Sequence, residues 1–336
     1  MIEDSVKPLL IGHRGAPGYR PEHTSSSYQL AFAQGVDAVE PDIVLSSDGV
    51  LVLRHENEIS GTTNVSERSE FADRYTTKTI DGKVVEGWFT EDFTWAELQT
   101  LTCNERLPDL RPQNTKYNGL ENILSLADLF KVIKEHENSA KKQISLVIEL
   151  KHVNYYEKQG FDFIALLMQE LKKHDWHDKP KQLTIESFEL GALNKLRVAG
   201  VKAELVFLME SKGGPADELE KIGTEKRNYA WYRSEEGLKY LSDKVHGISL
   251  DKIDLFELDS SDAFIGISDI VIRAHKHGLK VFTWTLRPEN KFLNPAFRLS
   301  GDNKLWGDWK REWQLILSTG LDGVFLDHPD MLAKVI

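Results

Sequence analysis

The stretch LLIGHRGAPGYRPEHT, residues 9–24, begins as an apolar run and turns polar within four residues. Residues 9–11 are apolar, whereas His13 and Arg14 follow directly after Gly12. A strand of a parallel sheet is covered on both faces and therefore reads as a short apolar run. In α/β folds the loops after the carboxyl ends of such strands carry the chemistry. The stretch predicts a buried parallel strand that ends in an imidazole and a guanidinium.

Seven further runs of this kind follow, and most are separated by segments with helical periodicity. The eight predicted strands are LLIGH at Leu9, AVEPDIV at Ala38, ISLVIEL at Ile144, QLTIESF at Gln182, KAELVFL at Lys202, VHGISL at Val245, KVFTWT at Lys280 and DGVFLD at Asp322. The predicted helices span 26–34, 125–136, 161–174, 190–199, 235–243, 262–277 and 309–318, with a last one after Pro329. This alternation predicts a parallel sheet covered by helices. Eight units in 336 residues predict one closed (β/α)8 TIM barrel that occupies residues 1–336 as a single domain.

Three regions depart from the simple alternation. The Asp-Gly pair at 48–49 predicts a hairpin after the second barrel strand. Residues 57–118 show only weak periodicity but contain several aromatic side chains, so we expect a small folded insertion subdomain there rather than a disordered linker. The long segment 285–308 matches no pattern, and an ordinary surface loop and a substrate lid are both open interpretations.

Composition excludes several classes of function. There are 42 Lys and Arg against 53 Asp and Glu, a net charge of −11, and no long basic stripe, so we expect no nucleic-acid partner. The single cysteine, Cys103, provides neither an internal disulfide nor a cysteine metal site. No apolar run approaches the roughly 18 residues that cross a bilayer, so we expect no stable membrane insertion. Oligomeric state is left open by the sequence.

The first ten residues, MIEDSVKPLL, do not combine a cationic segment with an apolar one, as a secretory leader would. We therefore expect a cytoplasmic location for the chain as given. A periplasmic or secreted location is the expectation if a leader was removed.

Polar and ionisable residues stand at the predicted carboxyl ends of the strands. They are His13, Arg14, Glu40, Asp42, Glu149, Lys151, Glu186, Ser187, Asp251, Trp284 and Asp327. In a (β/α)8 barrel these ends meet at one face, where the active site forms. The strand ends therefore predict a polar pocket at the mouth of the barrel.

Three of these residues are carboxylates with metal-ligand spacing. Glu40 and Asp42 are two residues apart on a strand, so their side chains leave the same face. Together with Glu149 they would repel one another at one barrel mouth unless a cation lay between them. Oxygen ligands favour a hard cation such as Mg²⁺ or Ca²⁺. Any one carboxylate alone could instead cap a helix or pair with an arginine, but three at strand ends favour a metal site.

Two histidines and two positively charged side chains complete the predicted site. His13 follows the first strand and His55 follows the predicted hairpin. A lone histidine after a strand is more often structural, but two beside the carboxylates can divide the roles of general acid and general base. Arg14 and Lys151 would supply positive charge to an anionic substrate. With a divalent metal, these groups indicate cleavage of a phosphate ester.

Three segments in this order, GHRGAPGYRPEHT, AVEPDIVLSSDGVLVLRHE and VIELK, resemble the glycerophosphodiester phosphodiesterases. Weaker matches at ESF, FTWT and GVFLDHPD extend the resemblance over nearly the whole chain. The EHT variant and the insertion after His55 resemble the bacterial periplasmic branch. The resemblance implies a metal-dependent barrel enzyme that hydrolyses a glycerophosphodiester, a small-molecule substrate, to glycerol 3-phosphate and an alcohol.

The same resemblance implies a role for the core residues. His13 and His55 would form the general acid and base pair. Glu40, Asp42 and Glu149 would hold one divalent cation, Mg²⁺ or Ca²⁺. Whether water or the neighbouring glycerol hydroxyl attacks the phosphorus is open, although the family favours the hydroxyl and a cyclic intermediate.

The resemblance also extends to the substrate. Arg14 and Lys151 would contact the phosphate, and Trp284 would form the wall at the glycerol end. Glu186 is a departure, because many members have glutamine there, and it adds a negative charge near the pocket.

Two alternatives remain beside this hypothesis. A phospholipase D-like or phosphoinositide phospholipase C-like barrel would share much of the site but would need an exposed apolar or cationic rim for lipid, against which the net charge of −11 argues mildly. A non-catalytic glycerophosphate-binding protein would have lost at least one core residue. The chain retains all of His13, Glu40, Asp42, His55 and Glu149.

Overall fold

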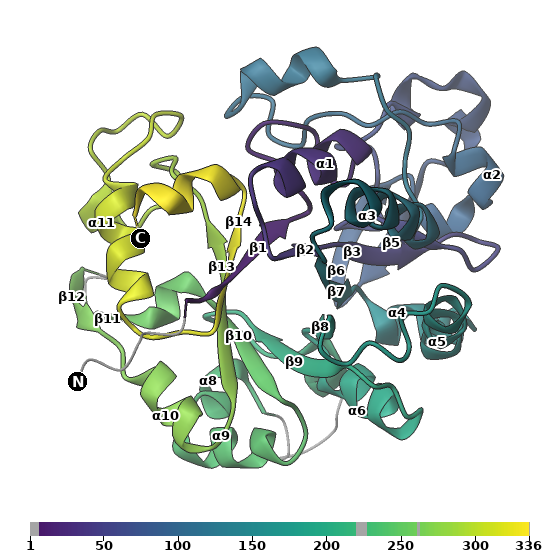
Figure 1. Cartoon of the computed structure of the whole chain (residues 1–336). Helices are drawn as coiled ribbons and strands as arrows, with labels where there is room; N and C mark the ends of the chain where they lie inside the picture. Colours follow the sequence, from purple (N-terminus) through teal and green to yellow (C-terminus); the bar gives the residue numbers. More distant parts are fainter. Residues whose placement is uncertain (1–6, 220–226, 261–262, 336) are drawn as a thin grey trace.

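Eight parallel strands close into a barrel in the computed structural model, which describes residues 7–219, 227–260 and 263–335. The barrel strands are β1 (Leu9–His13), β2 (Ala38–Glu40) with its continuation β3 (Asp42–Leu45), β7 (Ser145–Leu150), β8 (Leu183–Ser187), β9 (Glu204–Met209), β10 (Gly247–Asp251), β13 (Lys280–Leu286) and β14 (Gly323–Leu326). β1 pairs with both β2 and β14, and β2 and β3 pair with β7, so the ring is complete. The predicted barrel is confirmed (Figure 1).

Helices cover the outside of this ring (Figure 1). The main ones are α1 (Ser25–Ala33), α3 (Leu126–Ala140), α5 (Phe163–Lys173), α6 (Leu190–Val198), α9 (Glu235–Ser242), α10 (Ile270–Lys276) and α11 (Trp309–Leu317). Three short helices that the sequence pattern did not predict lie in loops, namely α4 (Val153–Lys158), α7 (Ala216–Leu219) and α8 (Tyr229–Tyr232). The segment predicted as a helix after Pro329 is a 3-10 helix, Pro329–Lys334.

The second barrel strand is split at Pro41, between β2 and β3. Proline has no N–H to donate to a sheet, but its carbonyl still accepts a hydrogen bond from the Glu149 N–H at 3.0 Å. The register places Glu40 opposite His13 and Asp42 opposite Glu149. The interrupted strand therefore places both of its carboxylates beside neighbouring strands that carry polar ends.

The predicted helix over 262–277 is wrong in its first half, and Asp262 itself lies outside the described residues. Residues Phe264–Ile267 form β12, which pairs antiparallel with β11 (Phe256–Leu258). The Phe264 ring lies 5.3 Å from the Phe256 ring and 5.4 Å from the Phe297 ring. Phe256 is close in sequence and Phe297 is distant, so a local hairpin and long-range packing together overrode a pattern that resembles an amphipathic helix.

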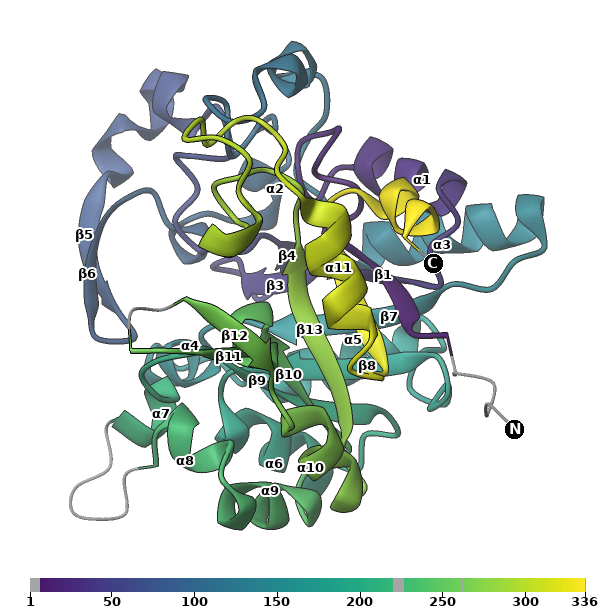
Figure 2. The ribbon, with the colours of Figure 1, turned by 90° about the vertical axis from the view of Figure 1, so that its left-hand side faces the viewer.

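The region 57–118 contains its own elements. After the hairpin strand β4 (Leu51–Leu53) come β5 (Thr76–Ile80), β6 (Lys83–Gly87) and α2 (Trp95–Leu98), with 3-10 turns at Val65–Glu67, Ser69–Arg74, Thr90–Asp92 and Pro112–Tyr117. Phe89 and Phe93 are fully buried. Figure 2 shows β5 and β6 projecting to one side of the barrel. Among the described helices, none is both long and apolar enough to cross a membrane.

Candidate active site

A pocket of about 310 Å³ opens at the carboxyl ends of the strands. The lining includes His13, Arg14, Glu40, His55, Glu149 and Trp284. Asp42 and Lys151, the other two predicted site residues, lie just behind this lining, where they contact Arg14 and Glu149. The structure therefore brings all eight predicted residues together.

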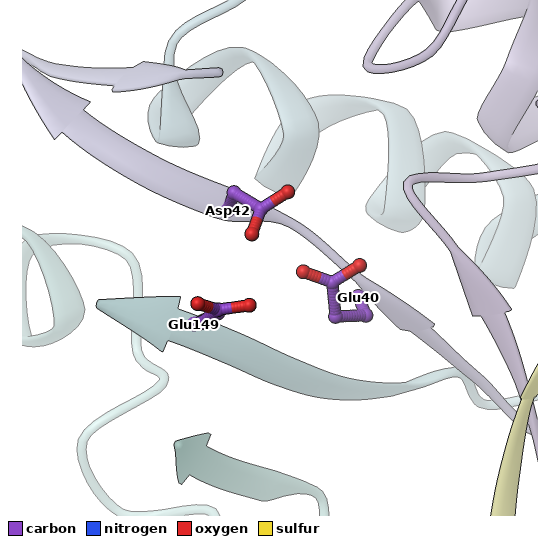
Figure 3. Close-up of side chains that lie close together, drawn as sticks. All are labelled: Glu40, Asp42 and Glu149. Atoms are coloured by element: carbon purple, nitrogen blue, oxygen red, sulfur yellow. The ribbon is translucent and has the colours of Figure 1, made fainter. Parts of the chain in front are cut away.

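The three carboxylates of Glu40, Asp42 and Glu149 face one another (Figure 3). One oxygen of each lies within 4.8 Å of the others. Glu40 Oε1 and Asp42 Oδ1 are buried and accept no hydrogen bond from the described residues. Buried oxygens without a hydrogen bond are unfavourable unless a cation or donor satisfies them, and the charged Lys151 Nζ lies 3.9 Å from Asp42 Oδ1. The donor set of three carboxylates fits one hard divalent cation.

Charge repulsion in this cluster gives a second indication of a cation. Burial, and then the nearby charge of Asp42, raises the pKa of Glu40 well above its ordinary value. Burial raises the pKa of Glu149 to about 8. Without a cation the three groups therefore do not all ionise at neutral pH, whereas a bound divalent ion would favour the ionised form of each.

Asp42 is the member of the cluster that stays ionised. Arg14 Nε lies 2.9 Å and His23 Nε2 3.0 Å from Asp42 Oδ2. Burial alone would raise the pKa of Asp42, but the adjacent Arg14 guanidinium holds it well below the ordinary value. Arg14 also pairs with Glu22 at 2.8 Å, and its backbone N–H donates to Glu40 Oε2 at 3.0 Å. Arg14 thus connects the start of the loop between β1 and α1 to the carboxylate cluster.

His13 belongs to a buried network at the end of β14. Its Nδ1 lies 2.7 Å from Asp327 Oδ1, and the other oxygen of Asp327 accepts hydrogen bonds from Arg111 at 2.7 Å and Arg287 at 2.6 Å. Burial, and then the charge of Arg14, lowers the pKa of His13 to about 4. The neutral ring then donates Nδ1–H to Asp327, which leaves Nε2 as an acceptor.

His55 is held in a comparable way. Its Nδ1 lies 2.5 Å from Glu56 Oε1, and its Nε2 lies 3.3 Å from Lys151 Nζ. Burial, with the positive charges of Arg14 and Lys151, lowers the pKa of His55 to about 3. Lys151 Nζ also donates to Glu149 Oε1 at 2.6 Å. Lys151 therefore joins the second histidine to the carboxylate cluster.

The opposite side of the pocket is aromatic. The Trp284 ring, on β13, makes an edge contact with the Phe188 ring at 5.7 Å. Trp284 Nε1 and Glu186 Oε2 are buried, and neither has a hydrogen-bond partner in the described part of the chain. Burial, and then the charge of Glu149, raises the pKa of Glu186 well above its ordinary value, which favours the neutral form of this carboxyl. Glu186 lies beside Glu149 in register and is not part of the three-carboxylate group.

Sequence reasoning missed several members of the site. Asp327 was noted as a strand end but received no role, and Arg111 lies in the insertion, where no periodicity marks it. Arg287 and Phe292 belong to the segment 285–308 and line the pocket. That segment is therefore part of the pocket wall and not a loop remote from the site. Apart from the strand-end position of Asp327, these residues carry no local sequence signal, because each is recruited by tertiary packing.

A barrel mouth with three carboxylates that could hold a cation, two neutral histidines and buried arginine and lysine side chains defines an enzyme that cleaves phosphate esters. A family model described as "Glycerophosphoryl diester phosphodiesterase family" matches residues 13–331. The chain belongs to this family.

Individual relatives agree with this family assignment. The chain is 30% identical to the glycerophosphodiester phosphodiesterase GDPD6 of Arabidopsis thaliana over 97% of this chain and 85% of the relative. It is 25% identical to a glycerophosphodiester phosphodiesterase of Haemophilus influenzae over 96% and 88%. These relatives come from a plant and a bacterium, so the bacterial periplasmic branch stays a prediction.

Solved structures share the fold. A putative glycerophosphoryl diester phosphodiesterase from Silicibacter pomeroyi superposes with a TM-score of 0.66 at 19% identity, over 99% of this chain and 94% of the other. An Oleispira antarctica phosphodiesterase in complex with the product sn-glycerol-3-phosphate superposes with a TM-score of 0.60 at 23% identity, over 98% and 96%. The barrel architecture is thus common to these proteins.

Proposed function

We propose that this chain hydrolyses glycerophosphodiesters to glycerol 3-phosphate and an alcohol, with His13 and His55 as the acid and base pair at a single divalent-cation site. The activity is supported by the family and by the relatives. One observation carries the mechanism. The three carboxylates of Glu40, Asp42 and Glu149 lie close together at the pocket that both histidines line.

The carboxylate group would hold the cation, either Mg²⁺ or Ca²⁺, since both accept oxygen ligands. When bound, the cation supplies positive charge for a phosphate oxygen and lowers the pKa of the attacking hydroxyl. Asp42 remains anionic because of Arg14, so it provides a permanent negative charge at this position. Glu40 and Glu149 would be held in the anionic form by the bound cation.

Nδ1 of each histidine is taken by a carboxylate, Asp327 or Glu56, so Nε2 would be the atom that exchanges the proton; in His55 this atom also lies 3.3 Å from Lys151 Nζ. One histidine accepts the proton of the attacking hydroxyl, and the other donates a proton to the leaving alkoxide. Both are neutral in the free site. The negative charge of a bound phosphodiester favours protonation of one of them, which provides the general acid.

Arg14 and Lys151 would position the phosphate. Both are buried and already paired with carboxylates, so they are held rigidly and their positive charge costs no reorganisation when substrate enters. Trp284 and Phe188 would contact the glycerol carbons, and Trp284 Nε1 remains available to donate to a hydroxyl.

The test is a coupled assay for glycerol 3-phosphate with glycerophosphocholine, glycerophosphoethanolamine and glycerophosphoglycerol. We expect release with Mg²⁺ or Ca²⁺ and none after exhaustive chelation. A transient cyclic glycerophosphate would identify the glycerol hydroxyl as the attacking group, and its absence under rapid quenching would identify water. Substrate binding without any release of product, in the presence of either cation, would support the non-catalytic binding protein instead.

Asp327→Asn is expected to lower kcat by about 100-fold with little change in KM, because Asp327 fixes the tautomer of His13 while its other oxygen is taken by Arg111 and Arg287. Asp327 also raises the pKa of His13, so the limb of the pH profile that reports His13 should move to lower pH in the variant. Steady-state kinetics across pH measures both effects. Asp330→Asn is the matched control, since Asp330 accepts a hydrogen bond from Tyr19 outside the pocket lining. A uniform loss at every pH would indicate a merely structural role for Asp327.

A further inference from the structure

A patch of exposed apolar side chains lies in the segment that forms one wall of the pocket. Nine large hydrophobic side chains are exposed in the described part of the chain, and three of them fall between residues 299 and 306. Leu299, Leu305 and Trp306 are 72%, 55% and 48% exposed. We call these three the 299–306 patch. Single exposed apolar residues are ordinary, but a cluster marks a surface for interaction.

Buried Asn290 holds this patch together. Its backbone N–H donates to the Leu305 carbonyl at 2.8 Å, and its Oδ1 accepts from the Leu299 N–H at 3.2 Å. Its Nδ2 donates to Ser300 Oγ at 3.0 Å and to the Asp302 carbonyl at 2.9 Å. The backbones of Leu299 and Leu305 therefore meet at one side chain. The loop is built with its apolar residues outward, so little conformational entropy is lost when the patch docks.

The patch lies on the rim of the active site. The backbone of Trp306 pairs with that of Glu289, two residues beyond the pocket-lining Arg287. The Trp306 ring also lies 5.8 Å from the ring of His328, which follows Asp327. Figure 2 shows this segment above the carboxyl end of β13. A surface bound to the patch would therefore lie next to the pocket mouth.

The charge around the patch is opposite to that of the whole chain. Residues 291–311 contain five basic side chains against two acidic ones, a local net charge of +3 where the chain carries −11. The basic residues are Lys291, Arg298, Lys304, Lys310 and Arg311, all exposed. None of them forms an ion pair with another described residue. By contrast, Glu289 and Glu312 on either side are buried and paired with Arg111 and Lys252.

We propose that the 299–306 patch docks this protein reversibly on an anionic lipid bilayer. Trp306, Leu299 and Leu305 enter the headgroup region, and the surrounding lysines and arginines contact the anionic headgroups. Tryptophan and leucine amid basic residues are the combination that binds at a membrane interface. This mode is peripheral and needs no membrane-spanning helix. It goes beyond the hydrolytic function and does not depend on it.

The test is co-sedimentation of the full chain with vesicles of phosphatidylcholine alone and of phosphatidylcholine mixed with phosphatidylglycerol. We expect binding to the anionic vesicles that weakens with salt. The triple variant Leu299→Ser, Leu305→Ser and Trp306→Ser should lower the partition coefficient by about 100-fold. A second variant, Lys304→Glu, Lys310→Glu and Arg311→Glu, should lower it by about tenfold or more.

The matched control is Val198→Ser, Ile265→Ser and Ile272→Ser, which removes three exposed apolar side chains from other surfaces and should leave partitioning unchanged. Turnover of a water-soluble glycerophosphodiester should be the same in all variants, because none of these residues lines the pocket. Equal partitioning of the patch variant and the unaltered chain would overturn the proposal. So would a dimer, measured by light scattering, that the patch variant abolishes, since the patch would then join two copies of this chain.

Discussion

His13→Ala and His55→Ala are each expected to lower kcat by about 10²- to 10⁴-fold, the usual contribution of a general acid or base. Both rings offer only Nε2 to the reaction, and alanine supplies no group that can carry a proton there. The double variant should be little worse than the poorer single variant, because the two histidines act in one proton-transfer sequence. Steady-state kinetics with saturating cation measures these effects.

A substrate with an activated leaving group separates the two roles. A glycerophosphodiester of p-nitrophenol needs little protonation of its leaving group, so the variant that lacks the general acid should recover most of its kcat. The variant that lacks the base should not recover. His277→Ala is the matched control, since His277 follows α10 at the opposite end of β13 and pairs with Glu235. Near-normal turnover of either active-site variant with the ordinary substrate would refute the assignment.

Glu40→Gln is expected to remove nearly all activity and the stabilisation that a divalent cation confers. Glutamine keeps the size of the side chain and removes one of the three charges that would bind the cation. At a cation concentration of about 100 times Kd, binding stabilises the fold by about 2.7 kcal/mol, which corresponds to a Tm increase of roughly 5 °C. Calorimetry with chelator, Mg²⁺ and Ca²⁺ measures this shift independently of turnover.

The pH dependence in chelator provides a second readout for Glu40→Gln. The folded-state pKa of Glu40 is raised above its ordinary value of 4.5. The Glu40 carboxyl therefore favours the fold fully only below that value, and its contribution is lost as pH rises toward the folded-state pKa. The free energy of unfolding of the unaltered chain, relative to the variant, should fall as pH rises above 4.5. With added cation, the free energy of unfolding of the unaltered chain, relative to the variant, should instead rise with pH.

Glu105→Gln is the matched control for the cation effect. Glu105 also lines the pocket and burial raises its pKa to about 7, but it lies outside the three-carboxylate group. Its variant should keep the full cation-dependent Tm increase. If Glu40→Gln kept that increase as well, the cation would have to bind elsewhere.

The barrel was predictable because each of its strands is marked locally. Parallel strands are buried on both faces, so runs such as ISLVIEL stand out from the polar segments around them. The helix over 262–277 failed for the opposite reason. Phe264 lies opposite Leu258 in a hairpin and packs on the distant Phe297 ring, and a contact that far along the chain leaves no mark in a local window.

The candidate site likewise contains residues that the sequence could place and residues that it could not. Glu40, Asp42 and Glu149 could be placed together because alternation along a strand sets their direction and barrel closure sets their neighbourhood. Arg111, which binds Asp327, could not be placed, since it reaches the site from an insertion without periodicity. Long-range contacts of this kind depend on how loops pack and not on the residues next to them.

By itself the sequence determined the barrel, the polar strand ends and the eight residues that meet at the mouth, because strand period and burial act over a few residues. Only the tertiary structure decided the protonation of those residues. His13 and His55 are neutral and Asp42 is charged because burial and the cations around them change the free energy of the charged forms. The outward-facing apolar patch was likewise decided by tertiary contacts, since Asn290 fixes the loop through bonds to residues 9 to 15 positions away.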